Sequence, residues 1–397
     1  MNILMVAHAY PPNRTTASRR THGLSHGLVQ LGHSVTLLSE RISENDLRYD
    51  STNKPVFKDG LNTVLVFPHQ QSMINKLYCN LLDFISPSKR PRKLYNTLSS
   101  LDFNNSKFDI IWATFPDHCS LAIAEKLSRK LNIPWVVDFR DCYQDKMSLL
   151  QRLLLPVRMN SLKNVISSAH AITSVAKALS DQLNRIKPNI PVYIIENAFD
   201  KNRLPKTLIY SPIKKTISFV FTGTIIKNVG QTLIPLLDSL KRNERLIDLN
   251  VKVEVFGRVT QQVINQHKKH KLANLINFHG IVSRETALMN SAKADILVMG
   301  HIMSSKLYDY ISVQRPILMT RSDFGECERH IHDNNIGWAP RNNDEMDAAI
   351  KEIFYMAKKR NIPSIKPGIA KKFEYSERAK KLDKILTKVA KKFTYQY

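Results

Sequence analysis

Residues 3–38 of the chain read ILMVAHAYPPNRTTASRRTHGLSHGLVQLGHSVTLL. The apolar run from Ile3 to Ala7 predicts a short strand, and the polar, proline-bearing stretch from Tyr10 to Thr16 predicts a loop. Apolar residues then recur at helical spacing, at Ala17, Leu24, Leu28 and Leu31, and Gly32 ends the predicted helix. Ser34 to Leu38 resumes a strand. This order opens a parallel, doubly wound sheet with a functional loop at the carboxyl end of its first strand.

The same alternation of strand and helix continues along the chain. Further strands are predicted at 109–112, 135–138, 171–173 and 192–195, with a helix over 121–131. Residues 197–216 carry two prolines and several lysines without a sustained period, which is typical of an interdomain linker. A second alternation follows, with strands predicted at 218–222, 251–256, 276–279, 295–299 and 316–319 and helices at 232–240 and 305–313.

Two successive α/β halves of similar size predict two Rossmann-like domains that face one interdomain cleft. We place the N-terminal domain at residues 1–200 and the C-terminal domain at 201–374. The segment 375–397 is a basic helix with one apolar stripe, and we expect it to pack back on the N-terminal domain.

The chain has 397 residues and a formal net charge of +25, because 59 Lys and Arg residues stand against 34 Asp and Glu residues. Such a charge suits nucleic acid, an anionic membrane surface or a phosphorylated substrate, and it also fits the composition that low-GC genomes encode. Four scattered cysteines exclude a disulfide framework and fit a reducing compartment. No apolar run reaches membrane-spanning length and no signal segment is recognisable, so we expect a cytoplasmic protein.

The sequence motifs for metal-assisted or P-loop nucleotide binding are absent. There is no GxxxxGK[ST], GxGxxG or DxD motif, and no HExxH or GxSxG motif either. We therefore expect chemistry that uses neither a metal ion nor a bound cofactor.

Polar residues instead follow the ends of predicted strands. In the first half these residues are His118, Arg140 and Asp141, and in the second half they are Gly223, Lys227 and Arg258. The segment 300–306 also follows a strand and runs into a helix. The free N–H groups of that helix, together with Ser305 and Lys306, are suited to hold a phosphate.

Six fragments carry a resemblance to a known family. They are YPPNRTTASRRTHGLSHGLVQLGHSVTLLS, IPWVVDFRDCYQD, VYIIENAFD, FVFTGTI, INFHGIVSRE and SSKLYDYISVQRPIL. In this order over most of the chain they resemble glycosyltransferase family 4, a family of retaining enzymes with the GT-B fold. The first is similar to the N-terminal loop, helix and GHxVT strand of the family, and the second to a segment common in transferases for surface polysaccharides. The remaining four resemble the entry into the linker and three C-terminal landmarks.

The resemblance implies a nucleotide-sugar donor on the C-terminal domain, a glycan or lipid-pyrophosphate-linked acceptor on the N-terminal domain, and transfer with retention. It implies that Lys306 binds the diphosphate, that Asp309 binds the ribose, and that His301 contacts the sugar. The remaining candidate donor contacts are Gly223, Lys227, Arg258, Val282 and Ser305, and the candidate catalytic residues of the N-terminal domain are His118, Arg140 and Asp141.

Simpler structural roles remain open for several of these residues. Arg140 and Asp141 could form an ion pair that steadies their loop, with Asp138 as the structural member. Asp309 could pair with Lys306 three residues before it. His301 and Asp309 stand where the family has two glutamates, so an alternative is a catalytically inactive GT-B-like binding or chaperone subunit.

Two segments of the N-terminal half combine apolar and basic residues, 74–95 and 147–163. This combination favours contact with an anionic membrane surface, although the leucines could equally face the core. Aromatic residues do not interleave with basic ones on one face, so nucleic acid is not expected as a partner. We therefore expect a cytoplasmic transferase, peripheral at the inner face of the membrane, in surface polysaccharide synthesis; the sequence leaves its oligomeric state open.

Overall fold

The chain forms two α/β units. Unit 1 comprises Met1–Asn197 and Tyr375–Tyr397, and unit 2 comprises Ala198–Glu374. The chain therefore crosses between the units twice, at residues 197–198 and at residues 374–375. The computed structural model describes residues 1–40, 42–46, 48–51, 53, 59–66, 107–141, 156, 159–160, 162–187, 189–205, 216–225, 233–244, 250–300 and 305–395.

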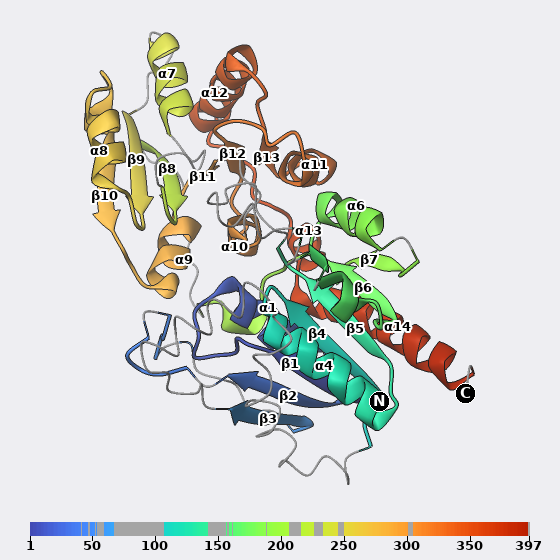
Figure 1. Ribbon diagram of the computed structural model, residues 1–397. Helices are drawn as coiled ribbons and strands as arrows, with labels where there is room; N and C mark the ends of the chain where they lie inside the picture. The colour runs from blue at the N-terminus through green and yellow to red at the C-terminus, as the bar shows by residue number, and fades with distance from the viewer. Residues whose placement is uncertain are drawn as a thin grey trace. The chain divides into compact units, whose positions relative to one another are not determined.

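Unit 1 is built on a seven-stranded parallel sheet in the order β3-β2-β1-β4-β5-β6-β7 (Figure 1). The strand order reverses between β1 and β4. The strands are β1 (Asn2–Ala7), β2 (Ser34–Glu40), β3 (Leu61–Val66), β4 (Ile110–Phe115), β5 (Trp135–Phe139), β6 (Ala171–Ser174) and β7 (Val192–Ile194). The helices of this unit include α1 (Thr16–Gln30), α4 (His118–Leu131), α6 (Lys177–Ile186) and α14 (Tyr375–Thr394).

Helix α14, drawn in red in Figure 1, packs on helix α1. The contact is close because two glycines of α1 face it: a Cβ at Gly23 would lie 2.2 Å from the ring of Tyr375, and one at Gly27 would lie 2.4 Å from the Cβ of Ala379. Glycine removes the side chains that would hold the helices apart. The C-terminal helix is thus an integral part of unit 1.

Unit 2 repeats the plan with a six-stranded parallel sheet in the order β10-β9-β8-β11-β12-β13. Its order reverses between β8 and β11. The strands are β8 (Thr216–Thr222), β9 (Asn250–Phe256), β10 (Ile276–Gly280), β11 (Ile296–Met299), β12 (Ile317–Met319) and β13 (Gly337–Trp338). The α-helices are α7 (Ile234–Arg242), α8 (Gln261–Lys268), α9 (Arg284–Ala292), α10 (Lys306–Ser312), α11 (Glu326–Asp333), α12 (Asn343–Lys358) and α13 (Pro367–Lys371).

The central strands of both sheets, among them β1, β4, β5, β8 and β11, are buried on both faces along most of their length, which explains their largely apolar sequences. In β11, Ile296 and Val298 enter the core that α7 and α12 cover, whereas Leu297 and Met299 enter the core on the opposite face. This arrangement confirms the expected α/β architecture of two doubly wound units. Across the described residues, no helix is both long and apolar enough to cross a bilayer.

Candidate functional site

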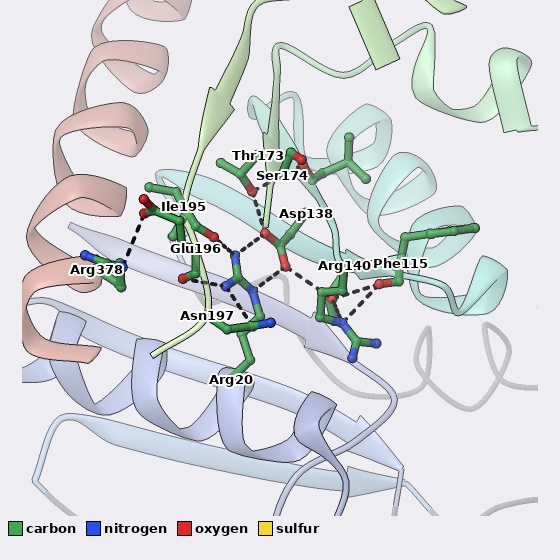
Figure 2. Close-up of polar contacts among 12 residues, drawn as sticks. Arg20, Phe115, Asp138, Arg140, Thr173, Ser174, Ile195, Glu196, Asn197 and Arg378 are labelled. Carbon is green, nitrogen blue, oxygen red and sulfur yellow. Dashed lines mark hydrogen bonds and ion pairs between the residues drawn. The ribbon is translucent and has the colours of Figure 1, made fainter. Parts of the chain in front are cut away.

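In unit 1, candidate residues gather where β4 and β5 end. Arg140 follows β5 directly, and its Nε donates hydrogen bonds to the hydroxyl of Thr114 at 2.8 Å and to the carbonyl oxygen of Phe115 at 3.0 Å (Figure 2). His118 begins α4, and its ring meets the Phe115 ring edge-on at 5.3 Å. Because β4 and β5 are neighbours, the fold brings Arg140 and His118 to the same residue.

Arg140 is half-buried, and this burial lowers the pKa of its guanidinium, although Asp138 and Asp141 act in the opposite direction. Asp141 is exposed. Within the described part of the chain, the two terminal nitrogens of Arg140 make no hydrogen bond. They can therefore donate to a carboxylate, a phosphate or sugar hydroxyls.

Asp138 has the structural role that the sequence allowed, but its partner is a different arginine. Arg20 of α1 donates to both carboxylate oxygens of Asp138, at 2.9 and 2.7 Å, and both side chains are completely buried (Figure 2). Asp138 also accepts a hydrogen bond from Thr173 at 2.7 Å. The ion pair thus holds the end of β5 rather than the loop of Arg140 and Asp141.

His8, which was not among the predicted site residues, also lies at this edge of the sheet. It follows β1, and burial lowers its pKa; Asp117 opposes this effect, whereas Arg140 and Arg48 reinforce it. Its position directly after a buried strand is the signal that could have identified it.

In unit 2, Lys306 and Gly223 meet where the strand order reverses. Gly223 follows β8 with a φ of +122°, and a Cβ there would lie 2.2 Å from Cε of Lys306 and 2.6 Å from its Nζ. The same Nζ lies 4.4 Å from the centre of the Phe221 ring. Burial lowers the pKa of Lys306 from its ordinary 10.5 to about 8, and Asp309 partly offsets this effect.

The loops that follow β8, β9 and β10 contact one another through glycine backbones. Gly223 donates its N–H to the carbonyl of Phe256 at 2.7 Å, and Gly257 donates to Gly280 at 2.6 Å. A Cβ at Gly257 would lie 2.0 Å from the carbonyl oxygen of Gly223, so only glycine fits. Arg258, the next residue, is exposed beside this edge.

Asp309 lies on α10 and pairs with Arg284 of α9, at 2.7 Å. Arg284 therefore fixes one oxygen of this carboxylate, and the charge of Asp309 also acts on Lys306. Arg284 was not predicted, and it also donates to the carbonyl of Arg203 at 3.5 Å. Ser305 precedes α10, and Val282 is a partly buried residue packed on the core beneath α9 and α10.

Two predicted site residues, Lys227 and His301, lie outside the described residues. The apolar and basic segment 74–95 lies outside them entirely, as does most of 147–163. Among the residues that the structure describes, no group of three or more His, Cys, Asp or Glu side chains is arranged to hold a metal ion.

Comparisons with known proteins bear on the family and the fold. Residues 17–203 match the model of glycosyltransferase family 4. A search of curated proteins by sequence gave no match.

Solved structures match the chain over nearly its whole length. Sucrose-phosphate synthase from Thermosynechococcus elongatus matches with a TM-score of 0.63 and 11% identity, over 98% of this chain and 99% of that one. Anabaena HepE, solved in complex with UDP and glucose, matches with a TM-score of 0.62 and 13% identity, over 98% and 100%. The lipopolysaccharide outer core galactosyltransferase WaaB matches with a TM-score of 0.57 and 12% identity, over 95% and 98%. These likenesses confirm the GT-B fold.

Proposed function

We propose that this GT-B glycosyltransferase, whose residues 17–203 carry the family 4 domain, transfers a hexose or N-acetylhexosamine from a nucleoside-diphosphate sugar with retention and without a metal ion. The acceptor that we propose is a glycan or a lipid-pyrophosphate-linked oligosaccharide, in the synthesis of a surface polysaccharide. One observation carries the donor half of this proposal: the half-buried ammonium of Lys306 lies against the glycine turn after β8.

The position and charge of Lys306 suit a diphosphate. Ligands of open α/β sheets bind outside the carboxyl ends of the strands where the order reverses, and Gly223 and Lys306 lie at that point of unit 2. When the sugar departs, negative charge develops on the nucleoside diphosphate. A cation fixed in a poorly solvated place stabilises this charge more strongly than one in water. Lys306 can supply that stabilisation, and exposed Arg258 can add to it.

Asp309 suits the ribose. An ionised carboxylate accepts hydrogen bonds from two vicinal hydroxyl groups. Arg284 holds one carboxylate oxygen of Asp309 at 2.7 Å and so fixes its direction. We propose that Val282 and Ser305 complete the donor contacts and that Lys227 and His301 contribute from segments outside the described residues.

In unit 1, Arg140 and His118 are the groups we propose for the acceptor and the sugar. Nε of Arg140 is fixed by two hydrogen bonds, so its terminal nitrogens point in a defined direction at little entropic cost. Asp141, exposed beside it, is a candidate for binding hydroxyl groups of the acceptor.

Donor binding tests the proposal. Calorimetric titration with UDP, GDP and CMP sugars should give one clear binder, and Asp309→Asn should weaken that binding at least tenfold. An exposed carboxylate of the same unit, changed in Asp333→Asn, is the control. If none of the three nucleotides binds the wild-type chain, the transferase proposal is wrong and the inactive-subunit alternative stands.

Retention needs a separate measurement. With the donor identified, proton NMR of the first product formed should show the same anomeric configuration as the donor sugar. An inverted product would refute retention while leaving the transferase assignment intact. Turnover that persists in excess EDTA would support the absence of a metal requirement.

A membrane partner is proposed from helix α14. Its buried stripe faces unit 1, and its outer side exposes six lysines: Lys380, Lys381, Lys384, Lys388, Lys391 and Lys392. A lysine row on an amphipathic helix is attracted to anionic lipid. Flotation with vesicles containing phosphatidylglycerol should carry the protein upward at low salt, and Lys384→Glu with Lys388→Glu should abolish this. Equal flotation with neutral vesicles would refute an electrostatic contact.

A further inference from the structure

Arg20 makes more hydrogen bonds than its ion pair with Asp138 requires. A guanidinium has five N–H donors, and among the described residues five acceptors surround Arg20 (Figure 2). Two are the carboxylate oxygens of Asp138. The other three belong to the last residues of unit 1 before the chain crosses to unit 2: the carbonyl of Ile195 at 2.8 Å, the carbonyl of Glu196 at 3.1 Å and the side-chain oxygen of Asn197 at 3.4 Å.

The returning crossing is tied to the same helix. Arg20, Gly23 and Gly27 are spaced by three and four residues, so they lie on one face of α1. Tyr375, the first residue of unit 1 after the return, packs against Gly23, and Ala379 packs against Gly27. One face of α1 therefore holds both places where the chain changes unit.

The two crossings are also linked to each other. The carboxylate of Glu196, on the outgoing segment, lies 3.3 Å from Nε of Arg378 on α14 (Figure 2). The same carboxylate lies 3.5 Å from Nζ of Lys381 on the same helix. Arg378 is buried. The outgoing segment is thus held by Arg20 through its backbone and by α14 through its one acidic side chain.

The same network reaches the candidate site. Thr114 lies between the two arginines: its hydroxyl is 3.4 Å from Asp138 and accepts from Nε of Arg140 at 2.8 Å. If the crossing segment moved, the hydrogen bonds of Arg20, Asp138 and Thr114 would transmit the movement to Arg140. A buried ion pair is a poor source of stability but a good means of fixing one arrangement.

We propose that Arg20 is a positioning residue that fixes both chain crossings to helix α1 and to the sheet edge that carries Arg140. Domains of one chain commonly move relative to each other, and the segments where the chain crosses between them are the places that absorb such motion. Arg20 therefore holds the crossing segments in a fixed position on unit 1, and turnover depends on this position.

The test compares Arg20→Lys with a matched buried arginine. Arg315 of unit 2 is also buried and also donates to backbone carbonyls, those of Ala294 at 2.7 Å and Asp295 at 3.3 Å. The hydrogen bonds that it makes to described residues all lie within unit 2. Lysine keeps the charge in both variants and loses the fork that reaches several acceptors. Hydrogen exchange is measured by mass spectrometry on the full chain, in peptides covering residues 192–197 and 375–382.

Arg20→Lys should speed exchange of both peptides about tenfold, as expected for the loss of one or two hydrogen bonds, and Arg315→Lys should leave them unchanged. The donor Kd should stay within about twofold in Arg20→Lys, while kcat should fall at least tenfold; this kinetic arm rests on the proposed function, whereas the exchange arm does not. If Arg20→Lys does not fold, Glu196→Gln serves instead and should speed exchange in 375–382. Equal exchange in the two arginine variants, or an unchanged 375–382 peptide in Glu196→Gln, would overturn the proposal.

Discussion

Replacing Lys306 with methionine should stabilise the ligand-free protein and abolish its affinity for the nucleotide. The reason is the depressed pKa of this lysine, about 8 in the folded protein against 10.5 for an ordinary lysine. Below pH 8 the folded protein must keep a charge where burial disfavours it. Because the unfolded chain binds this proton more strongly, stability rises as the pH increases from 8 towards 10.5.

The size of the effect follows from the shift. A difference of 2.5 pKa units corresponds to about 3 kcal/mol at pH 7, and remaining solvent contact reduces this to about 2 to 3 kcal/mol. Methionine fills a similar volume but loses the contact of the ammonium with the Phe221 ring, which contributes about 0.5 to 1 kcal/mol. The net stabilisation is about 1 to 2 kcal/mol, or roughly 2 to 8 °C in Tm for a unit of this size.

Differential scanning fluorimetry at pH 7 and pH 9.5, with and without UDP, provides the measurement. The Tm advantage of Lys306→Met should shrink by more than half at pH 9.5, because most of the proton-linked penalty is gone there. UDP should raise the Tm of the wild-type protein and leave that of the variant unchanged. Lys293→Met, at an exposed position of the same unit, should change neither quantity. A variant that melts lower than wild type and still responds to UDP would refute the reasoning.

Three further outcomes are expected. Nucleotide binding near pH 8 should take up protons, because a diphosphate raises the pKa of Lys306; titration in two buffers of different ionisation enthalpy measures this, and equal heats would contradict it. Gly257→Ala should abolish UDP binding, since its Cβ would meet a backbone oxygen at 2.0 Å, whereas Gly368→Ala, with no atom within 4 Å, should bind normally. Arg284→Met should raise the donor KM about tenfold with little change in kcat, because Asp309 loses the partner that directs it; a fall in kcat alone would point to another role.

Strands that end in glycine were the most predictable part of the fold. The strand predicted at 218–222 is observed at Thr216–Thr222, and the one predicted at 251–256 is observed at Asn250–Phe256. The first is a largely apolar run, and the second alternates apolar and polar residues; each is followed by a glycine with positive φ, so the pattern and the turn agree locally. Strands β3 and β13 were missed, since β13 has only two residues and β3 is a short strand without a sustained alternation.

The partners of charged residues were much harder to predict. Arg20 and Asp138 are 118 positions apart, and Arg284 and Asp309 are 25 apart, so only the tertiary fold brings them together. One local signal existed nevertheless. Arg20 falls on the apolar stripe of α1, three residues after Ala17 and four before Leu24, where a buried charge requires a partner. Its neighbour Arg19 lies off that stripe, so the phase of the helix distinguishes the two arginines.

The return of the chain to unit 1 has a consequence for synthesis on the ribosome. All of unit 2 emerges before Tyr375, so the sheet of unit 1 must wait for its last helix while unit 2 can already fold. Before α14 is synthesised, the surface of α1 at Gly23 and Gly27 is not covered by this helix, and Glu196 lacks the basic partners that α14 supplies. Docking of α14 on α1 can therefore take place only after the whole of unit 2 has been synthesised.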